Sequence, residues 1–216
     1  MQKFIIKLSF ILISNLVFSF SFAQERKTID LEIGVDIPKL LISLDPFQQK
    51  YEGEIGISFN QEIILVLQPG YRYQKFDKHN YDYKVEGSYL RTGIFFQTGR
   101  SSIMKGGMGF LFSASSFSDW AVASLRNSFW GDFDEETEKR NHMSYWIEIP
   151  FVIKWKIQKH FYFKLSWSNR FLIKNPRYNE SFPIYTVVGY GSTQFIFMPA
   201  LTTTVGFVFP FKKTLE

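Results

Sequence analysis

The sequence of 216 residues contains no cysteine. A chain without cysteine has no disulfide framework and no thiolate metal site, so its fold must be stabilised in another way. Histidine is scarce, with three residues, and the formal net charge is only +5. Because acidic residues are spread throughout the chain, this charge does not indicate a nucleic-acid-binding protein. No motif implies a cofactor.

Beyond its N-terminus the chain also lacks any run of about 18 uncharged apolar residues, which excludes a helical membrane protein. The N-terminus itself reads MQKFIIKLSFILISNLVFSFSFA, with Lys3 and Lys7 ahead of an apolar run and a small residue at Ala23. This pattern predicts a secretory signal peptide, residues 1–23, that is cleaved after Ala23. A retained N-terminal anchor helix is the alternative. Residues 24–216 are expected to form one domain.

Aromatic side chains, in contrast, are abundant and make up 19% of the chain. They lie in segments where apolar and polar residues alternate with a period of two, as in β-strands with two different faces. In YWIEIPFVIKWKIQK, residues 145–159, apolar side chains take every odd position from Tyr145 to Ile157, and Lys154 and Lys156 take even positions. Eight such segments are predicted as strands: residues 29–37, 50–59, 62–73, 85–97, 103–117, 145–159, 161–173 and 193–211.

The links between these segments alternate in length. Short turns are predicted near Asn60, at 98–102 and at 158–160, and longer links at 38–49, 74–84, 118–143 and 174–192. An even number of antiparallel strands, with short turns at one end and long loops at the other, is typical of outer-membrane barrels. The predicted fold class is therefore all-β: an eight-stranded antiparallel up-and-down transmembrane β-barrel in the outer membrane, with both termini on the periplasmic side.

A soluble β-sandwich or lipocalin-like barrel would show the same alternation with its apolar face inward. Side-chain volume favours the membrane barrel, because the interior of an eight-stranded barrel is only just wide enough for side chains. Phe, Trp, Tyr and Ile crowd one face of the predicted strands, and small or charged residues occupy the other. The bulky face is expected to contact lipid, and the charged face to fill the lumen.

Charged side chains of both signs would then point into the lumen. Unpaired charges in a narrow, poorly hydrated space cost several kcal/mol each, so a cross-lumen network of ion pairs is predicted. Such a network would fill the barrel; a narrow polar conduit is the alternative. The predicted members are Asp30, Glu32, Glu52, Glu54, Arg72, Arg91, Lys105, Glu148, Lys154, Lys156, Lys164 and Arg170.

Four prolines interrupt the predicted strands: Pro69, Pro150, Pro199 and Pro210. Proline cannot donate a ladder hydrogen bond, so each is expected to mark a strand end or a β-bulge. Pro150 lies on the inward face in mid-strand, where a bulge is predicted.

The two longest links are rich in aromatic residues. Residues 120–129 are predicted to form a short amphipathic helix, and the acidic WGDFDEETE that follows its apolar part lacks the regular ligand spacing of a calcium loop. Aromatics in long loops more often contact a partner or cap a barrel than take part in chemistry. The candidate partner-contact residues are Trp120, Leu125, Phe129, Trp130, Tyr178, Phe182 and Tyr185.

One pair of residues could serve catalysis. His142 and Ser144 are two positions apart, which places both on one face of a strand. A lipid-modifying membrane enzyme could use a His and a Ser in this way. A loop histidine with no catalytic role is the simpler interpretation, so no catalytic residue is assigned.

Several segments together resemble a known family. The succession IGVDIPKL, YEGEIGISF, GSYLRTGIFF, GGMGFLFSASSF, SYWIEIPFVIKWKI and TTTVGFVFPF resembles a family of small, functionally uncharacterised outer-membrane barrel proteins from Bacteroidota. The resemblance implies fold and location and no catalytic residues. Outer-membrane machines for protein insertion, secretion and uptake in that phylum contain extra barrel subunits, so by analogy an accessory subunit is expected. Its partners would be outer-membrane lipid and other outer-membrane proteins.

Overall fold

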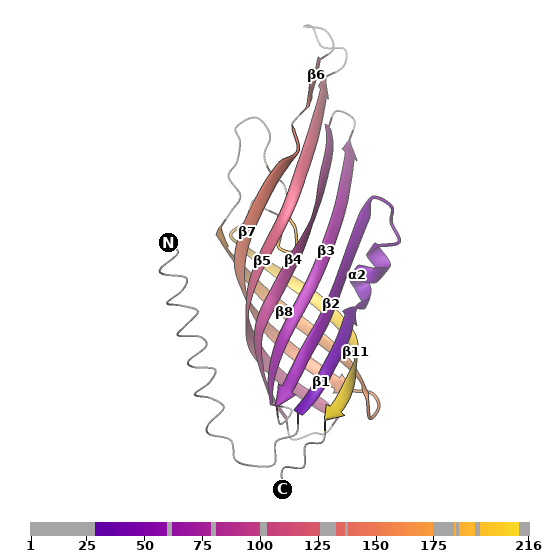
Figure 1. Ribbon diagram of the computed structural model, residues 1–216, viewed down its shortest axis with the longest axis vertical. Coiled ribbons are helices and arrows are strands. Elements are labelled where there is room, and N and C mark those ends of the chain that lie inside the picture. The colour runs from indigo at the N-terminus through magenta and orange to yellow at the C-terminus, as the bar shows by residue number, and fades with distance from the viewer. Residues whose placement is uncertain are drawn as a thin grey trace.

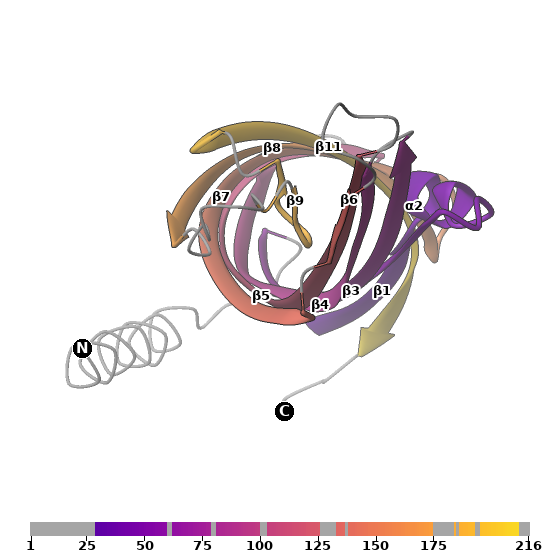
Figure 2. The same cartoon turned by 90° about the horizontal axis from the view of Figure 1, so that it is seen from above.

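Eight long antiparallel strands form a closed barrel (Figure 1). The computed structural model describes residues 29–59, 62–78, 81–99, 103–125, 133–136, 138–174, 184, 186–192 and 195–211. The barrel strands are β1 (Ile29–Asp36), β2 (Gln48–Phe59), β3 (Ile63–Lys78), β4 (Tyr81–Thr98), β5 (Met104–Leu125), β7 (Arg140–Lys156), β8 (Phe161–Lys174) and β11 (Phe197–Phe211). Each pairs with the strands before and after it, and β1 pairs with β11 to close the ring, which Figure 2 shows from above. The predicted eight-stranded up-and-down barrel is confirmed.

Four smaller elements accompany the barrel: α2 (Ile37–Ile42), β6 (Phe133–Glu136), β9 (Thr186–Val187) and β10 (Gly191–Ser192). Helix α2 follows β1 and lies at the side of the wall next to β2 (Figure 1). Strand β6 pairs with the end of β5. Strands β9 and β10 pair with each other, and β9 lies within the outline of the barrel in Figure 2.

The two faces of the strands point as the alternation predicts. Bulky residues lie on the outer surface, for example Phe151, which is 47% exposed, and Leu201, which is 60% exposed. Charged residues such as Arg91 and Glu148 are 1% and 0% exposed because they point into the lumen. The bulky apolar face of most strands therefore lies outside, where there is room for it.

The link-length pattern is correct at one end of the barrel and partly wrong at the other. In the chain, only residues 60–62, 99–103 and 157–160 separate β2 from β3, β4 from β5 and β7 from β8. The adjoining ends of these strands lie at the lower end in Figure 1, where β1 begins and β11 ends. At the upper end the predicted link 74–84 is wrong, because Lys78 of β3 pairs with Tyr81 of β4. The sequence of this segment, KFDKHNYDYK, is mostly polar, but Phe76 and Tyr83 face the lumen, where Tyr83 is buried and Phe76 is partly buried.

The predicted helix at residues 120–129 is also wrong for Trp120–Leu125. This segment continues β5 and pairs with both β4 and β6. Ala121 faces inward and is fully buried, so the period of two extends above the predicted strand end. Residues 126–132 lie outside the described residues.

The prolines divide into two groups. Pro199 and Pro210 lie close to the ends of β11, as predicted. Pro69 and Pro150 lie in mid-strand without a bulge: Met108 pairs with Phe151 and Leu111 with Glu148, so the register is unchanged across Pro150. The bulge predicted at Pro150 is wrong. The irregularity of β7 lies instead between Tyr145 and Trp146, on its β8 side.

Candidate functional site: the barrel lumen

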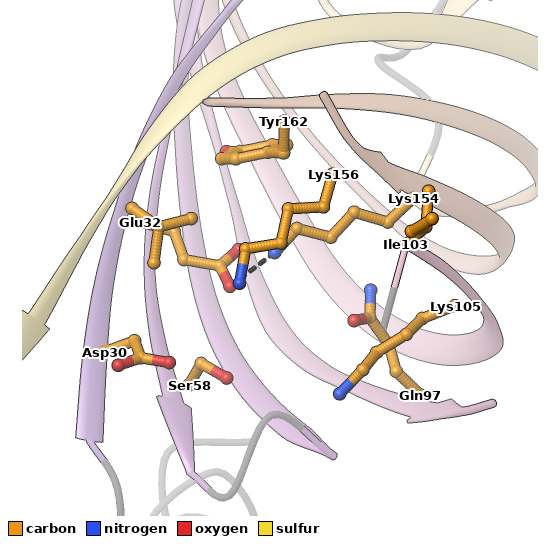
Figure 3. Close-up of a pocket in the computed structure, with 10 residues that line it drawn as sticks. Asp30, Glu32, Ser58, Gln97, Ile103, Lys105, Lys154, Lys156 and Tyr162 are labelled. Carbon is orange, nitrogen blue, oxygen red and sulfur yellow. Dashed lines mark hydrogen bonds and ion pairs between the residues drawn. The ribbon is translucent and has the colours of Figure 1, made fainter. Parts of the chain in front are cut away.

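The lower mouth of the lumen is a small polar vestibule (Figure 3). Its cavity volume of about 50 Å³ leaves room for a few water molecules. Lysines from β5 and β7 face acidic residues from β1 across this space. The polar lining residues are Asp30, Glu32, Ser58, Gln97, Lys105, Lys154, Lys156 and Tyr162.

Two ion pairs close the lumen above this vestibule. Lys154 Nζ lies 2.5 Å from Glu32 Oε1 and 4.3 Å from the centre of the Tyr162 ring. Lys164 Nζ pairs with Glu54 Oε2, which also accepts a hydrogen bond from Gln68 Nε2 at 2.5 Å. Basic residues on β7 and β8 thus neutralise acidic residues on β1 and β2. Each of these buried carboxylates meets a cation, as a low-dielectric interior requires.

Glycines make room for the Tyr162 ring in this layer. Gly206 is the direct partner of Tyr162 across the β8–β11 ladder and of Gly34 across the β1–β11 ladder. A Cβ at Gly206 would lie 2.3 Å from Tyr162 Cζ, so no larger residue fits without a shift. The ring therefore lies over backbone, where it can cover the Glu32 and Lys154 pair.

A second ion-pair layer lies at mid-height. Glu148 Oε2 is 3.2 Å from Arg170 Nε and 3.5 Å from Arg91 Nη1, and Trp146 Nε1 donates to Glu148 Oε1 at 2.7 Å. The other nitrogen, Arg91 Nη2, pairs with Glu52. Because Arg91 comes from β4, Glu52 from β2 and Glu148 from β7, this layer ties together strands on different sides of the barrel.

The helix α2 contributes a cation to the same layer. Lys39 Nζ lies 2.7 Å from Asp36 Oδ2 and 2.6 Å from Glu52 Oε2, although Lys39 belongs to a segment predicted as a loop. Asp36 also caps the helix, because its Oδ1 accepts a hydrogen bond from the Lys39 backbone N–H at 3.1 Å. Asp36 followed by Pro38 is a helix-start signal, and it could have predicted α2.

Apolar side chains occupy the upper lumen, which the sequence analysis missed. Four apolar residues in or next to β9 and its following turn lie inside the barrel: Ile184, Val187, Val188 and Tyr190 are at most 2% exposed. They pack against inward-facing residues of the wall, namely Tyr83, Val85, Tyr89, Phe117, Ala121 and Trp146. Burial of each large apolar side chain contributes on the order of 1.5–3 kcal/mol, so the inward position is strongly favoured.

Polar contacts hold this inner hairpin, residues 186–192, in position. Arg170 Nη1 donates to the backbone oxygens of Gly189 and Tyr190 at 2.9 and 3.1 Å. Gly189 has φ of +83°, and a Cβ there would lie 2.5 Å from the Tyr89 ring. Only glycine adopts this conformation readily and leaves space for the ring.

The structure brings eight of the twelve predicted network residues into ion pairs: Glu32, Glu52, Glu54, Arg91, Glu148, Lys154, Lys164 and Arg170. Asp30, Lys105 and Lys156 line the vestibule. Arg72 Nη2 donates to Gln74 Oε1, a neutral group.

Two of the candidate partner-contact residues, Trp120 and Leu125, lie on β5. Trp120 Nε1 donates to Glu136 Oε1 at 2.7 Å on the outer side of β5 and β6. Leu125 ends β5. The inner hairpin, from the same link as Tyr185, is buried in the lumen. Phe129, Trp130, Tyr178, Phe182 and Tyr185 lie outside the described residues.

The candidate catalytic pair lies at the upper mouth. His142 and Ser144 share the inward face of β7, but Ser144 is fully buried. His142 Nε2 is 2.8 Å from Asp119 Oδ1, and Arg140 Nη2 is 2.6 Å from Asp119 Oδ2. The Asp119 carboxylate therefore serves Arg140 and His142 together, as in a structural ion-pair cluster.

Within the described residues there is no group of three or more His, Asp or Glu that could hold a metal ion. Nor does that part of the chain contain a helix long and apolar enough to cross a membrane.

One protein family matches this sequence over nearly its whole length, residues 1–214. The chain belongs to the family described as Domain of unknown function (DUF6048). The expected membership of a family without an assigned function is confirmed. Among curated proteins, none matches the sequence.

Solved structures similar to this DUF6048 chain are also barrels. The N-terminal β-barrel domain of Pseudomonas aeruginosa OprF is 13% identical, with 84% of this chain and 97% of that chain covered and a TM-score of 0.36. Ail, the attachment invasion locus protein of Yersinia pestis, is 7% identical (85% and 97% covered, TM-score 0.43). A major outer membrane protein from Thermus thermophilus is 8% identical (86% and 100% covered, TM-score 0.47). Identities this low concern the fold alone.

Proposed function

We propose that the protein is a non-enzymatic outer-membrane β-barrel with a closed lumen, which acts as a structural or accessory subunit of a larger outer-membrane complex for protein insertion, secretion or uptake. The filling of the lumen by two ion-pair layers and the inner hairpin carries this proposal. A filled barrel has only its outer wall and its two rims left for contacts with other molecules.

The outer wall supports a place in a membrane. Exposed apolar side chains extend over the barrel strands, for example Ile33 on β1, Phe112 on β5 and Ile153 on β7, each more than 40% exposed. Aromatic contacts lie near both ends of the wall. The ring centres of Phe161 and Phe207 are 4.7 Å apart near the lower end, and those of Tyr51 and Tyr71 are 6.4 Å apart near the upper end. Two aromatic girdles around an apolar band are typical of outer-membrane barrels.

The export features belong to the same proposal. A signal peptide at residues 1–23, a single domain at 24–216, periplasmic termini and a source in Bacteroidota are what the sequence and the family resemblance predict. The short turns at the end where β1 begins support the periplasmic placement, because outer-membrane barrels have short periplasmic turns.

The test of an accessory role is site-specific photo-crosslinking in intact outer membranes. A photoreactive amino acid is introduced in place of Phe112 or Leu201, whose side chains face outward. The same amino acid in place of Ser113, which faces the lumen, is the matched control. We expect the same discrete crosslinked partner proteins from the outward positions and none from Ser113. Recovery of only lipid adducts at every outward position, together with a monomeric protein after mild detergent extraction, would contradict the accessory role.

The two alternatives make different predictions. A narrow channel would give stable single-channel steps when the purified protein is placed in a planar bilayer, and a closed lumen should give none. A lipid-modifying enzyme would lose its activity in a His142→Ala variant. We expect unchanged lipid profiles by mass spectrometry in that variant, because the contact of His142 with Asp119 stabilises the fold.

A further inference from the structure

The barrel wall has a notch at its upper rim next to α2. Strand β1 is eight residues long, the shortest of the barrel strands, and its last pair joins Asp36 to Thr204. Both neighbours of β1 continue above its end. Strand β11 reaches up to Phe197, and β2 reaches from Gly53, its last residue paired with β1, up to Gln48. Helix α2 lies at this place in the wall (Figure 1), and Ser43 Oγ accepts a hydrogen bond from the Lys50 backbone N–H at 2.7 Å.

Two cations face each other beside the notch. Lys50 of β2 and Arg72 of β3 are direct cross-strand partners, and both point inward, since they share the faces of the buried Glu52 and Gln74. Like charges in this relationship destabilise a sheet. No ion pair of the described residues includes either side chain, and Arg72 is hydrogen-bonded to the neutral Gln74.

The charges around this pair are also positive. Those that act most strongly on Lys50 are Lys39, Arg72, Arg170 and Arg91, all cations. The described cluster contains five cations and three carboxylates: Lys39, Lys50, Arg72, Arg91 and Arg170 against Asp36, Glu52 and Glu148. Every carboxylate already has a partner, so by formal charge the surplus of two falls on Lys50 and Arg72. Uncompensated charge in a half-buried position favours binding of an anion.

The neighbouring residues place this pair at the level of a membrane surface. Tyr51 and Tyr71, the next partners along the same ladder, stack on the outer face of the wall, and tyrosine is enriched at membrane interfaces. Next to them, Leu41, Leu44 and Phe47 of α2 and its following turn are 52–80% exposed, which suits contact with acyl chains.

We propose that Lys50 and Arg72 form a binding site for a phosphate group, of the kind carried by the headgroup of a membrane lipid. The guanidinium of Arg72 presents a planar fork that binds two phosphate oxygens, and Lys50 adds a mobile charge from the opposite strand. The bound phosphate would neutralise the surplus charge of the cluster.

Binding of inorganic phosphate tests the site in a zwitterionic detergent. We expect calorimetric binding by the unchanged protein and at least about tenfold weaker affinity in Lys50→Gln and Arg72→Gln variants, since one charge-assisted contact is lost in each. Lys156→Gln is the matched control, because Lys156 faces the lumen at the other mouth. No binding by the unchanged protein, or equal loss in the control, would overturn the proposal.

The effect on stability separates a binding site from a structural cation. Without phosphate, Arg72→Gln should raise the midpoint of urea unfolding, because it removes a like-charge contact. With saturating phosphate, the same variant should be less stable than the unchanged protein. A loss of stability in Arg72→Gln that phosphate does not alter would show that Arg72 is structural, and the site would be wrong.

The source of the phosphate is identified in bilayers. The protein is refolded in phosphatidylcholine nanodiscs with added phosphatidic acid, whose headgroup is a bare phosphate ester, and retained lipid is measured by native mass spectrometry. Retention of phosphatidic acid that is lost in the Lys50→Gln, Arg72→Gln double variant and kept in Lys156→Gln supports a lipid headgroup. Phosphate binding without lipid retention supports a soluble phosphate ligand. This lipid arm depends on the proposed membrane placement, whereas the detergent experiment does not.

Discussion

Lys154 of β7 reaches across the lumen to Glu32 of β1, with 2.5 Å between Nζ and Oε1, although the two residues are 122 positions apart in the chain. Because β7 and β1 are not neighbours in the barrel, no sheet register brings these residues together. Their contact and those of Glu148 connect the walls through the interior. Filling of the lumen, and with it the proposed closed barrel, rests on contacts of this kind.

Removal of one partner of the Lys154–Glu32 pair should be costly. Lys154→Met leaves Glu32 buried without its cation, and we expect a loss of about 3–5 kcal/mol in the free energy of unfolding. The double variant Lys154→Met, Glu32→Leu should recover much of this loss because no buried charge is left alone. Urea unfolding in detergent or vesicles, analysed as a double-mutant cycle, measures the coupling. Additive losses would show that the two side chains do not interact.

Glu148 should be among the most sensitive carboxylates. It is fully buried and contacts Arg91, Arg170 and Trp146, so Glu148→Gln is expected to destabilise the protein by about 3 kcal/mol or more. Glu86→Gln is the control, because Glu86 pairs with the exposed Lys139 and such a pair contributes about 1 kcal/mol at most. Similar losses in both variants would contradict a central role for Glu148.

The inner hairpin should leave the lumen when its turn is strained. Gly189→Ala places a methyl group against the Tyr89 ring in a conformation that disfavours alanine. Because the chain has no cysteine, a single Val188→Cys reports the position of the hairpin. We expect this thiol to be protected from a maleimide reagent and to become reactive when Gly189→Ala is added. Lys139→Cys at an exposed site is the reactive control. A thiol at position 188 that reacts without the Gly189 change would show that the hairpin is not held inside.

The outer wall should reject charge in a lipid bilayer. Phe151 is exposed in mid-strand on β7, and Phe151→Arg is expected to cost about 2–4 kcal/mol near the bilayer centre. Refolding into phosphatidylcholine vesicles followed by urea unfolding measures this cost. A soluble barrel would tolerate the same surface change within about 0.5 kcal/mol, so a negligible effect would contradict the membrane placement.

Processing of the N-terminus gives a simple test of export. Cleavage after Ala23 predicts a mature chain that begins at Gln24. Intact-mass measurement of the protein isolated from outer membranes would show this directly. A protein that keeps residues 1–23 would instead support the anchor-helix alternative.

Much of the barrel could be predicted from the sequence, because the face of a strand on which a side chain lies depends only on local alternation. The odd positions of residues 145–157 point outward and Glu148 points inward wherever β7 lies in the ring, since alternate side chains of a strand lie on opposite faces. The prediction failed at residues 74–84, where a strand segment has the polar composition of a loop, and at α2, where a short helix lies in a predicted link.

The sequence by itself determined which side chains of the strands face the lumen, and the tertiary structure decided what each of them contacts there and which residues of the links join them. Lys39 shows the difference: its position in the chain predicts only a link, and the folding of α2 onto the wall brings its Nζ to 2.6 Å from Glu52. The inner hairpin is another case, because Val187 and Val188 are buried in a cluster with residues of β4, β5 and β7, which lie far from them in the sequence. Closure of the ring sets distances between non-neighbouring strands, and local periodicity carries no information about those distances.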